Sequence, residues 1–317
     1  MCIYTVQFTV MQILIELPTW LGDCVMATPA IENIVNFDND TQITLIGSFV
    51  SIEALKNHPE VVKTVVLSKK YRDLVKISKE LGGFDIFFSF RSSIRSKFLK
   101  FFISAENKYQ FDKNTYQNRH QVEKYNDFVN DSLSINLTAK KLQIYGYSTS
   151  KNKKKILGIN PGASYGSAKR WYPEEFAKVA GELSSQYDIV IFGGPGEKDI
   201  AMDIEKSLLE KGIDNYQNLA ANTTIPELID HISKLDLFIT GDSGPMHVAA
   251  AFQVPTVAIF GPTKDDETSQ WMNDKSIIVK KNLGCQPCMK RTCPLQHHEC
   301  MKLITAVEVL DAVKGLD

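Results

Sequence analysis

The stretch "FITGDSGPMHVAAA", residues Phe238–Ala251, decides the fold, because it contains a strand, a turn and a helix start in direct succession. The apolar run Leu237–Thr240 predicts a buried strand, and the Gly, Asp and Ser residues after it favour a turn. Pro245 then suits the first turn of a helix, where its missing N–H costs nothing. A strand that leads through a short turn into a helix is typical of α/β domains with a parallel sheet.

The same alternation recurs along the chain in two series. The first has the strand-like runs "QILIEL", "QITLIG", "VKTVVL" and "DIFFSF", with a helix predicted around Cys24–Val35; the second has "KILGIN", "YDIVIFG", "DLFIT" and "TVAIF". The polar, lysine-rich "GYSTSKNKKK" separates them. We therefore predict an α/β protein of two doubly wound, parallel-sheet domains, residues 1–150 and 151–317. The linker is expected near residues 148–155, and the last helix is a candidate to pack back on the first domain.

Composition excludes several classes of protein. The 317 residues are 44% hydrophobic and 23% charged with a net charge of -1, which argues against a dedicated nucleic-acid binder. No Lys or Arg precedes Lys56, so the positive start of a secretory signal is missing. No apolar run approaches the roughly 18 residues of a membrane span. We expect a cytoplasmic protein, with Met11 as a second candidate start, because a strand-like run follows it directly and the ten residues ahead could be a dispensable extension.

Loops that follow the strands of the second series predict a phosphate site, since ligands of such domains bind beyond the carboxyl ends of the strands. Ser243 and Gly244 are small and leave backbone N–H groups open at a helix N-terminus, which suits a diphosphate. Two plainer interpretations stay open here. Asp242 or Ser243 could only cap the helix, and His247 could be a packed core histidine.

Three further loops strengthen this prediction. "GINPGASYGSAKRWYPEEF" offers glycine backbone, serine hydroxyls and Lys169, although it is not a Walker A loop. "FGGPGEKD" carries Glu197, a candidate acceptor for ribose hydroxyls, and "FGPTKDD" ends another strand. Each loop alone could be an ordinary solvated turn, but four at strand ends of one domain predict a nucleotide-diphosphate site. Its candidate residues are Gly162, Ser164, Ser167, Lys169, Glu197, Asp242, Ser243, Gly244, His247, Gly261 and Thr263.

The motifs "TWLGDCVMATPAIENI", "GINPGASYGSAKRWYPEEFAKVA", "TGDSGPMHVAAAFQVPTVAIFGPT" and "CQPCMKRTCPLQHHECM" resemble glycosyltransferase family 9, the bacterial ADP-heptose:lipopolysaccharide heptosyltransferases. The resemblance implies a GT-B architecture of two facing Rossmann-like domains, with the acceptor bound by the first and the donor by the second. It also implies an inverting, metal-independent transfer of L-glycero-D-manno-heptose from ADP-heptose, without a cofactor. The implied acceptor is the heptosyl-Kdo-lipid A inner core at the inner membrane surface; which family acceptor is used, and which hydroxyl, stays open.

The same resemblance assigns roles to individual residues. Asp23 matches the proposed general base, and Lys169 the cation that stabilises charge on the departing ADP. Asp242, Ser243, Gly244 and His247 fall around the diphosphate and sugar, and Glu197 near the adenosine ribose. Inversion needs a base on the sugar face opposite the leaving group, a role that fits a carboxylate of the acceptor domain. Taken alone, Asp23 could equally be a helix cap, since Asp is a preferred capping residue.

The segment 91–124 is rich in basic and aromatic residues. It has eight Lys or Arg residues against three acids, with Phe and Tyr residues interleaved. We predict that part of it binds the anionic Kdo and phosphate groups of the acceptor, close to the membrane. The alternative is a solvated basic face. The named candidates are Arg91, Arg95, Lys97 and Arg119.

Four of the six cysteines form the pattern C-x2-C-x4-C-x6-C: Cys285, Cys288, Cys293 and Cys300. Four soft ligands at such spacing would suit Zn²⁺ or an iron–sulfur cluster. The spacing departs from a plain zinc ribbon, and the predicted chemistry needs no metal, so reduced thiols or an occasional disulfide are the favoured alternatives. The resemblance gives the cluster no catalytic role.

Other functions remain to be weighed against glycosyl transfer. A nucleotide-sugar 2-epimerase shares the two-domain architecture but has no need of an acceptor segment or of the Asp23 motif. A non-catalytic nucleotide-sugar binder would have no use for both Asp23 and Lys169. An NAD dehydrogenase is disfavoured because no G-x-G-x-x-G follows any strand.

Overall fold

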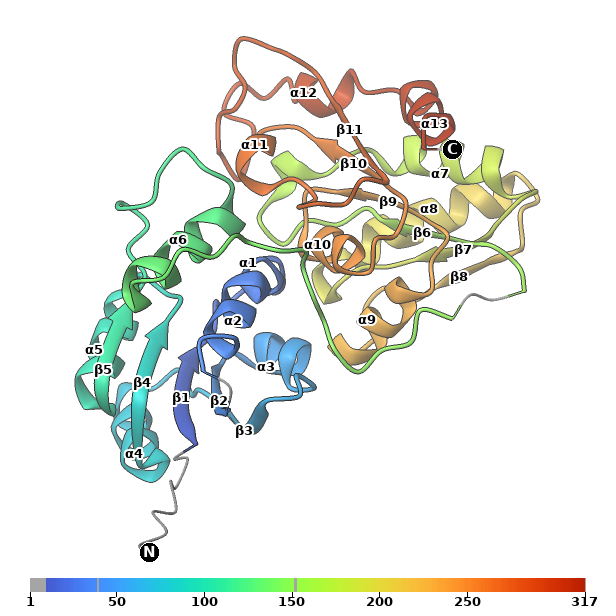
Figure 1. Cartoon of the computed structure of the whole chain (residues 1–317). Coiled ribbons are helices and arrows are strands. Elements are labelled where there is room, and N and C mark those ends of the chain that lie inside the picture. Colours follow the sequence, from blue (N-terminus) through green and yellow to red (C-terminus); the bar gives the residue numbers. More distant parts are fainter. Residues whose placement is uncertain (1–9, 39, 151–152, 317) are drawn as a thin grey trace, which may run out of the picture. The chain divides into compact units, whose positions relative to one another are not determined.

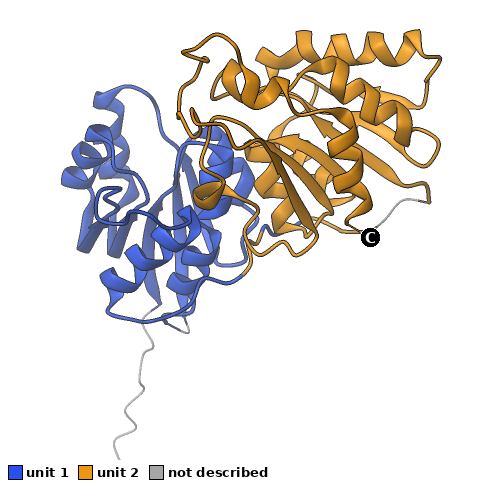
Figure 2. Ribbon diagram, turned by 90° about the horizontal axis from the view of Figure 1, so that it is seen from above, with its two compact units in different colours: residues 1–140, 144–146 blue, residues 141–143, 147–317 orange. Residues whose placement is uncertain are grey.

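The structure is a computed structural model that describes residues 10–38, 40–150 and 153–316 (Figure 1). It divides into two compact units, coloured separately in Figure 2: unit 1 comprises residues 1–140 and 144–146, and unit 2 residues 141–143 and 147–317. The predicted dispensable extension ahead of Met11 lies outside the described residues except for its last residue. Residues 151 and 152 of the predicted linker also lie outside them.

Unit 1 is built on a parallel sheet with helices packed against it. In its described part, five strands pair in the order β3-β2-β1-β4-β5, all parallel. The strands are β1 (Met11–Glu16), β2 (Thr41–Gly47), β3 (Val61–Val66), β4 (Gly83–Ser89) and β5 (Ser104–Gln110). The helices are α1 (Leu21–Met26), α2 (Thr28–Val35), α3 (Phe49–Leu55), α4 (Tyr71–Leu81), α5 (Ile94–Phe102) and α6 (Gln121–Leu133).

Unit 2 repeats this plan. Its described residues form a sheet of six parallel strands in the order β11-β10-β9-β6-β7-β8. The strands are β6 (Ile156–Asn160), β7 (Asp188–Ile191), β8 (Tyr216–Asn218), β9 (Leu237–Gly241), β10 (Thr256–Phe260) and β11 (Ser276–Lys280). The helices are α7 (Pro173–Leu183), α8 (Lys198–Glu210), α9 (Ile225–Ser233), α10 (Gly244–Ala251), α11 (Asp265–Thr268), α12 (Glu299–Lys302) and α13 (Ala306–Lys314). The predicted pair of parallel-sheet α/β domains is therefore confirmed.

The helix predicted around Cys24–Val35 is two helices, α1 and α2, which meet at Ala27. Pro29 is in the first turn of α2. Proline has no N–H to donate to the preceding turn, so it suits a new helix start better than a helix interior. Periodicity alone cannot detect this break, because apolar residues continue across it.

Each unit buries an apolar layer between its sheet and helices. Unit 1 packs Leu14, Ile46 and Phe87 of its central strands against Leu74 and Leu99 of α4 and α5. In unit 2 the largest cluster includes the fully buried strand residues Ile159, Ile191 and Ile239. The last helix, α13, contributes Ala306 and Val309 to this cluster and packs against α7, β10 and β11 of its own unit. The candidate loops of unit 2 begin at the carboxyl ends of β6, β7, β9 and β10.

Candidate active site

In unit 2 the loops after β6, β9 and β10 meet around one buried ion pair. The Lys169 ammonium lies 2.7 Å from Asp242 Oδ2, and the two side chains are only 11% and 7% exposed. The Thr263 hydroxyl donates a hydrogen bond to the same carboxylate oxygen at 2.6 Å. Three residues predicted from three different loops are thereby in direct contact.

Asp242 and Ser243 do not cap α10 with their side chains. Ser243 occupies the N-cap position without a side-chain capping bond. Its hydroxyl instead accepts from Asn160 Nδ2 at 3.1 Å and lies 3.1 Å from the Thr240 hydroxyl. The side chain of Asp242 faces Lys169 and Thr263. Because the cap side chain is directed elsewhere, the helix N-terminus that starts at Gly244 keeps its anion-binding character.

Glu197 and Gly162 fit together at the ends of β7 and β6. Glu197 Oε2 accepts a hydrogen bond from the Gly194 backbone N–H at 2.7 Å, and the residue is 8% exposed. A side chain at position 162 would overlap the Glu197 carboxyl group. Glycine is required at position 162 because the loop backbone approaches this carboxylate closely.

The other predicted donor-site residues differ in exposure. Ser164 and Ser167 are exposed on the loop after β6, whereas His247 is buried in α10. Gly261 lies under the Met301 side chain, so its small size serves packing. The sequence-based candidates therefore fall into three groups: residues in contact around Asp242, exposed serines of the loop after β6, and the residues His247 and Gly261, which lie in the interior.

Two residues that sequence reasoning missed lie beside Lys169. The Tyr165 ring has the Lys169 ammonium 5.2 Å from its centroid and the Arg291 guanidinium 5.4 Å from it. The backbone carbonyl of Arg291 also accepts the Ala168 N–H at 3.0 Å. The "MKRTC" run gave no signal of this proximity, because Arg291 is far from Lys169 in the sequence.

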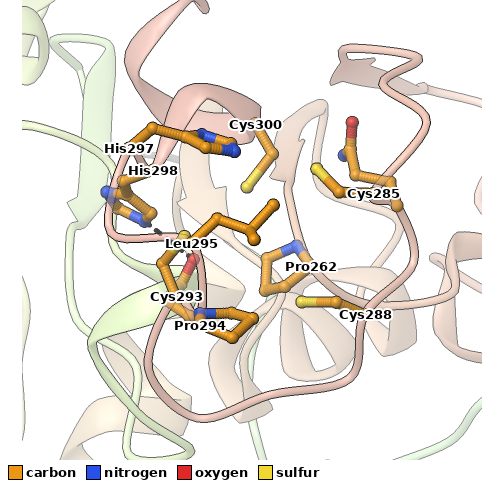
Figure 3. A pocket seen from close by; sticks show the side chains of 11 residues that line it. Pro262, Cys285, Cys288, Cys293, Pro294, Leu295, His297, His298 and Cys300 are labelled. Carbon is orange, nitrogen blue, oxygen red and sulfur yellow. Dashed lines mark hydrogen bonds between the residues drawn. The ribbon is translucent and has the colours of Figure 1, made fainter.

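The cysteine-rich segment, residues 285–300, lines a pocket next to these loops. Its four cysteines, His297 and His298 surround the side chains of Leu295 and Pro262 (Figure 3). All four thiols are free in the structure. Burial, followed by the nearby thiols, raises the pKa of Cys300 to about 11. Across the described ranges, no three His, Cys, Asp or Glu side chains are arranged to hold a metal ion.

The same segment holds the candidate loops in place. Met289 N–H donates to the Pro262 carbonyl at 2.9 Å, and Gln286 Nε2 to the Gly261 carbonyl at 2.6 Å. His298 Nε2 lies 3.0 Å from the Ala168 carbonyl oxygen. These contacts join the loop after β10 and the loop that carries Lys169 through residues 285–300.

In unit 1, Asp23 is the third residue of α1 and is half-buried. The N-cap is Trp20, which makes no side-chain capping bond, so Asp23 does not occupy the capping position. Burial raises the pKa of the Tyr125 hydroxyl well above its usual range, and the charge of Asp23 adds to this shift. Asp23 is thus close to the buried Tyr125 of α6.

A buried carboxylate that sequence reasoning missed anchors one acceptor-site candidate. Glu16 is fully buried at the end of β1 and accepts hydrogen bonds from Ser89 at 2.6 Å and Ser96 at 3.0 Å. Arg91 Nη1 lies 3.4 Å from Glu16 Oε1, the oxygen that also accepts from Ser96. Burial raises the pKa of Glu16, while Ser89 and Arg91 oppose the shift. Arg91 is therefore fixed beside the carboxyl ends of β1 and β4.

The remaining acceptor-site candidates have different environments. Arg95 donates to the Ser68 carbonyl, Lys97 is exposed on α5, and Arg119 pairs with Glu123 and Asp127. The aromatic residues also divide, since Phe111 belongs to the core whereas the α5 phenylalanines reach the surface. The predicted basic–aromatic segment is thus several distinct surfaces.

Comparison with known proteins identifies the family. The model of glycosyltransferase family 9 (heptosyltransferase) matches residues 75–299. The chain belongs to glycosyltransferase family 9. It is 46% identical over 315 residues to lipooligosaccharide heptosyltransferase 2 of Campylobacter jejuni, covering 96% of this chain and 98% of that relative. The resemblance to family 9 predicted from the motifs is therefore confirmed, and among the members of the family the motifs look most like those of heptosyltransferase II.

Solved glycosyltransferase structures share the fold of this chain. E. coli ADP-heptose lps heptosyltransferase II superimposes with a TM-score of 0.80 at 21% identity, covering 96% of this chain and 98% of that one. The iron-containing dodecameric glycosyltransferase TibC of enterotoxigenic E. coli gives 0.64 at 15% identity, covering 98% and 77%. These likenesses confirm the GT-B architecture of this family 9 glycosyltransferase.

Proposed function

We propose that this family 9 glycosyltransferase transfers L-glycero-D-manno-heptose from ADP-heptose to the heptosyl-Kdo-lipid A inner core of lipopolysaccharide, with inversion and without a metal ion. The observation that carries the proposal is the 46% identity, over nearly the full length of both chains, to a lipooligosaccharide heptosyltransferase 2. The Lys169–Asp242–Thr263 cluster beside the α10 N-terminus supports a donor site in unit 2. The alternative within the family is another acceptor step, that of heptosyltransferase I or III.

The donor site in this proposal is built from the strand ends of unit 2. Gly162, Ser164, Ser167, Glu197, Gly261 and Thr263 line it, with Asp242, Ser243, Gly244 and His247 around the diphosphate and sugar. Lys169 stabilises the charge that develops on ADP as the glycosidic bond breaks. Because Asp242 balances the charge of Lys169 at 2.7 Å, the diphosphate needs further positive potential. The α10 N-terminus and the Arg291 guanidinium, which shares the Tyr165 ring with Lys169, supply it.

The acceptor side of the proposal belongs to unit 1. Asp23 removes the proton from the acceptor hydroxyl as that oxygen attacks the anomeric carbon and ADP departs, which inverts the anomeric configuration. Such general-base assistance contributes roughly 10²–10⁴-fold to the rate. Arg91, Arg95, Lys97 and Arg119 are the candidates for the anionic groups of the acceptor, and the fixed position of Arg91 beside Glu16 favours it among them.

Metal independence belongs to this proposal too. TibC contains iron, but that likeness is one of fold. In this proposal Lys169, Arg291 and the α10 N-terminus neutralise the diphosphate in place of a divalent ion. Cys285, Cys288, Cys293 and Cys300 support the donor loops and take no part in the chemistry. We also propose a cytoplasmic location with peripheral attachment to the inner membrane; the described chain contains no helix long and apolar enough to cross a bilayer.

The test is an ADP-release assay with ADP-heptose, with and without heptosyl-Kdo-lipid A, in the presence and absence of EDTA. We expect release that requires the acceptor and persists in EDTA. Conversion of the nucleotide sugar into its epimer without acceptor, monitored by chromatography of the nucleotide sugar, would favour an epimerase. Activity with Kdo-lipid A that lacks heptose would instead assign the heptosyltransferase I step, and loss of activity in EDTA that returns with a divalent ion would remove the claim of metal independence.

A further inference from the structure

The exposed face of α5 carries large apolar side chains in unit 1. Ile94 is 81% exposed and Phe101 is 80% exposed. Lys97, also exposed, lies between them, because residues three and seven positions along a helix share a face. The opposite face of α5 is buried through Ser96 and Leu99. The exposed apolar residues are therefore additional to those that hold the helix on the sheet.

Aromatic rings continue this surface onto α4. The Tyr71 ring, 48% exposed, has its centroid 5.0 Å from that of Phe98, which is partly buried against the core of unit 1. The Phe102 ring centroid lies 4.9 Å from that of Phe98 and 5.1 Å from that of Phe101. We call this set the α5 ridge: Tyr71, Ile94, Phe98, Phe101 and Phe102. A contiguous apolar surface of this kind usually marks a site of interaction.

Basic residues border the α5 ridge. Burial, followed by the charge of Lys108 on β5, lowers the pKa of Lys100 on α5. Of the acids nearby, Asp73 accepts from Ser68 and pairs with Arg72, Glu80 pairs with Lys76, and Glu106 is exposed on β5. The balance is positive. The basic residues are Lys69, Lys70, Arg72, Lys97, Lys100 and Lys108.

We propose that the α5 ridge docks this glycosyltransferase on the surface of an anionic lipid bilayer. Aromatic side chains with apolar bodies partition into the interface between headgroups and acyl chains, and Lys and Arg beside them attract anionic headgroups. The two features occur together on α4 and α5, and this complementarity of charge selects a bilayer over an apolar protein partner. The inference rests on the proposed function in one respect: an acceptor carried by lipid A lies at such a surface.

The direct test is sedimentation with vesicles, which needs no substrate. The full chain is mixed with vesicles of phosphatidylethanolamine and phosphatidylglycerol, or of phosphatidylcholine alone. We expect binding to the anionic vesicles that weakens as salt rises, and little binding to the neutral ones. A double variant, Ile94→Ser with Phe101→Ser, should bind at least about tenfold more weakly, because two apolar side chains no longer enter the interface.

A matched control comes from unit 2. Leu209→Ser with Val307→Ser removes two exposed apolar residues, 57% and 64% exposed, and should leave vesicle binding unchanged. Circular dichroism and the melting temperature verify that both variants fold. Equal binding of the ridge variant and the wild type would overturn the proposal. So would a concentration-dependent dimer of the wild type that the ridge variant abolishes, which would show that a second copy covers the ridge.

Activity assays separate this inference from the proposed function. With an acceptor freed of its acyl chains, the ridge variant should keep the wild-type rate, whereas with acceptor embedded in vesicles its KM should rise. If the wild type is inactive with both acceptors but binds anionic vesicles through the ridge, the proposed function fails and the docking surface stands. If the wild type is active with both and the ridge variant matches it on vesicles, the docking surface fails alone.

Discussion

Lys169 and Asp242 form a buried ion pair at 2.7 Å, although one residue follows β6 and the other β9. The pair orients the ammonium group before any donor arrives, and Thr263 fixes the carboxylate from a third loop. In the proposed mechanism this preorganised ammonium stabilises the leaving group, since no reorganisation is needed at the moment of reaction. These contacts also join the loops after β6, β9 and β10, so a change in one loop affects the position of the others.

Replacing Lys169 by Met should lower kcat by about 10²–10³-fold, the usual effect of losing one preorganised donor to developing charge. The change also leaves Asp242 buried without its cation, so the melting temperature should fall. Steady-state kinetics and thermal unfolding measure the two effects. Lys178→Met, on the exposed surface of α7 and paired with Glu175, is the control and should change neither. Wild-type kcat in the Lys169 variant would remove this residue from catalysis.

Asp23→Asn should reduce kcat by roughly 10²–10⁴-fold with little change in stability, because the amide keeps the shape of the side chain but cannot accept a proton. Asp40→Asn, which changes an exposed acid of the same unit, should be neutral. The rates should be compared at saturating donor and acceptor. Full activity of Asp23→Asn would show that another group is the base.

Gly162→Ala should weaken donor binding, since the added methyl group would overlap the Glu197 carboxyl group and displace it from the Gly194 N–H. Gly196→Ala is a close control on the next loop, because a methyl group there meets nothing within 4 Å. The expected result is a raised KM for the donor in the first variant only. Equal KM values in the two variants would contradict a role for this corner of the loops.

Glu16→Gln should change how stability depends on pH. Burial raises the pKa of Glu16 above its ordinary value of 4.5, so the folded state holds this proton more tightly than the unfolded state does. The wild type therefore loses stability relative to the Gln variant as pH rises from about 4.5 through the raised pKa. Urea unfolding of both proteins between pH 4 and pH 8 measures the difference. A wild type that gains on the variant as pH rises would mean that the Arg91 ion pair outweighs burial.

Cys300 should react more slowly with iodoacetamide at pH 8 than Cys285, Cys288 and Cys293, since its pKa of about 11 leaves little thiolate and the residue is buried. Peptide mass spectrometry after timed alkylation gives the rates. Strong protection of all four thiols together with a stoichiometric metal in purified protein would contradict the free-thiol state.

Sequence reasoning reached the strand-end loops because each has a local signal: glycine, serine or a charged residue directly after a β-rich run. It could not find contacts between residues that are far apart in the sequence, such as Arg291 at Tyr165 or Arg91 at Glu16. It also treated residues 91–124 as one surface. Composition does not distinguish Phe111, which is buried in the core, from Phe101, which is 80% exposed, because burial depends on packing between elements.

The most direct test of the proposed function is the mass of the acceptor after incubation of the wild-type protein with ADP-heptose and heptosyl-Kdo-lipid A. We predict an acceptor that is heavier by one heptosyl unit, in an amount equal to the ADP released, and no such product from Asp23→Asn. An acceptor of unchanged mass, under conditions in which the protein is folded and binds ADP-heptose, would contradict the account.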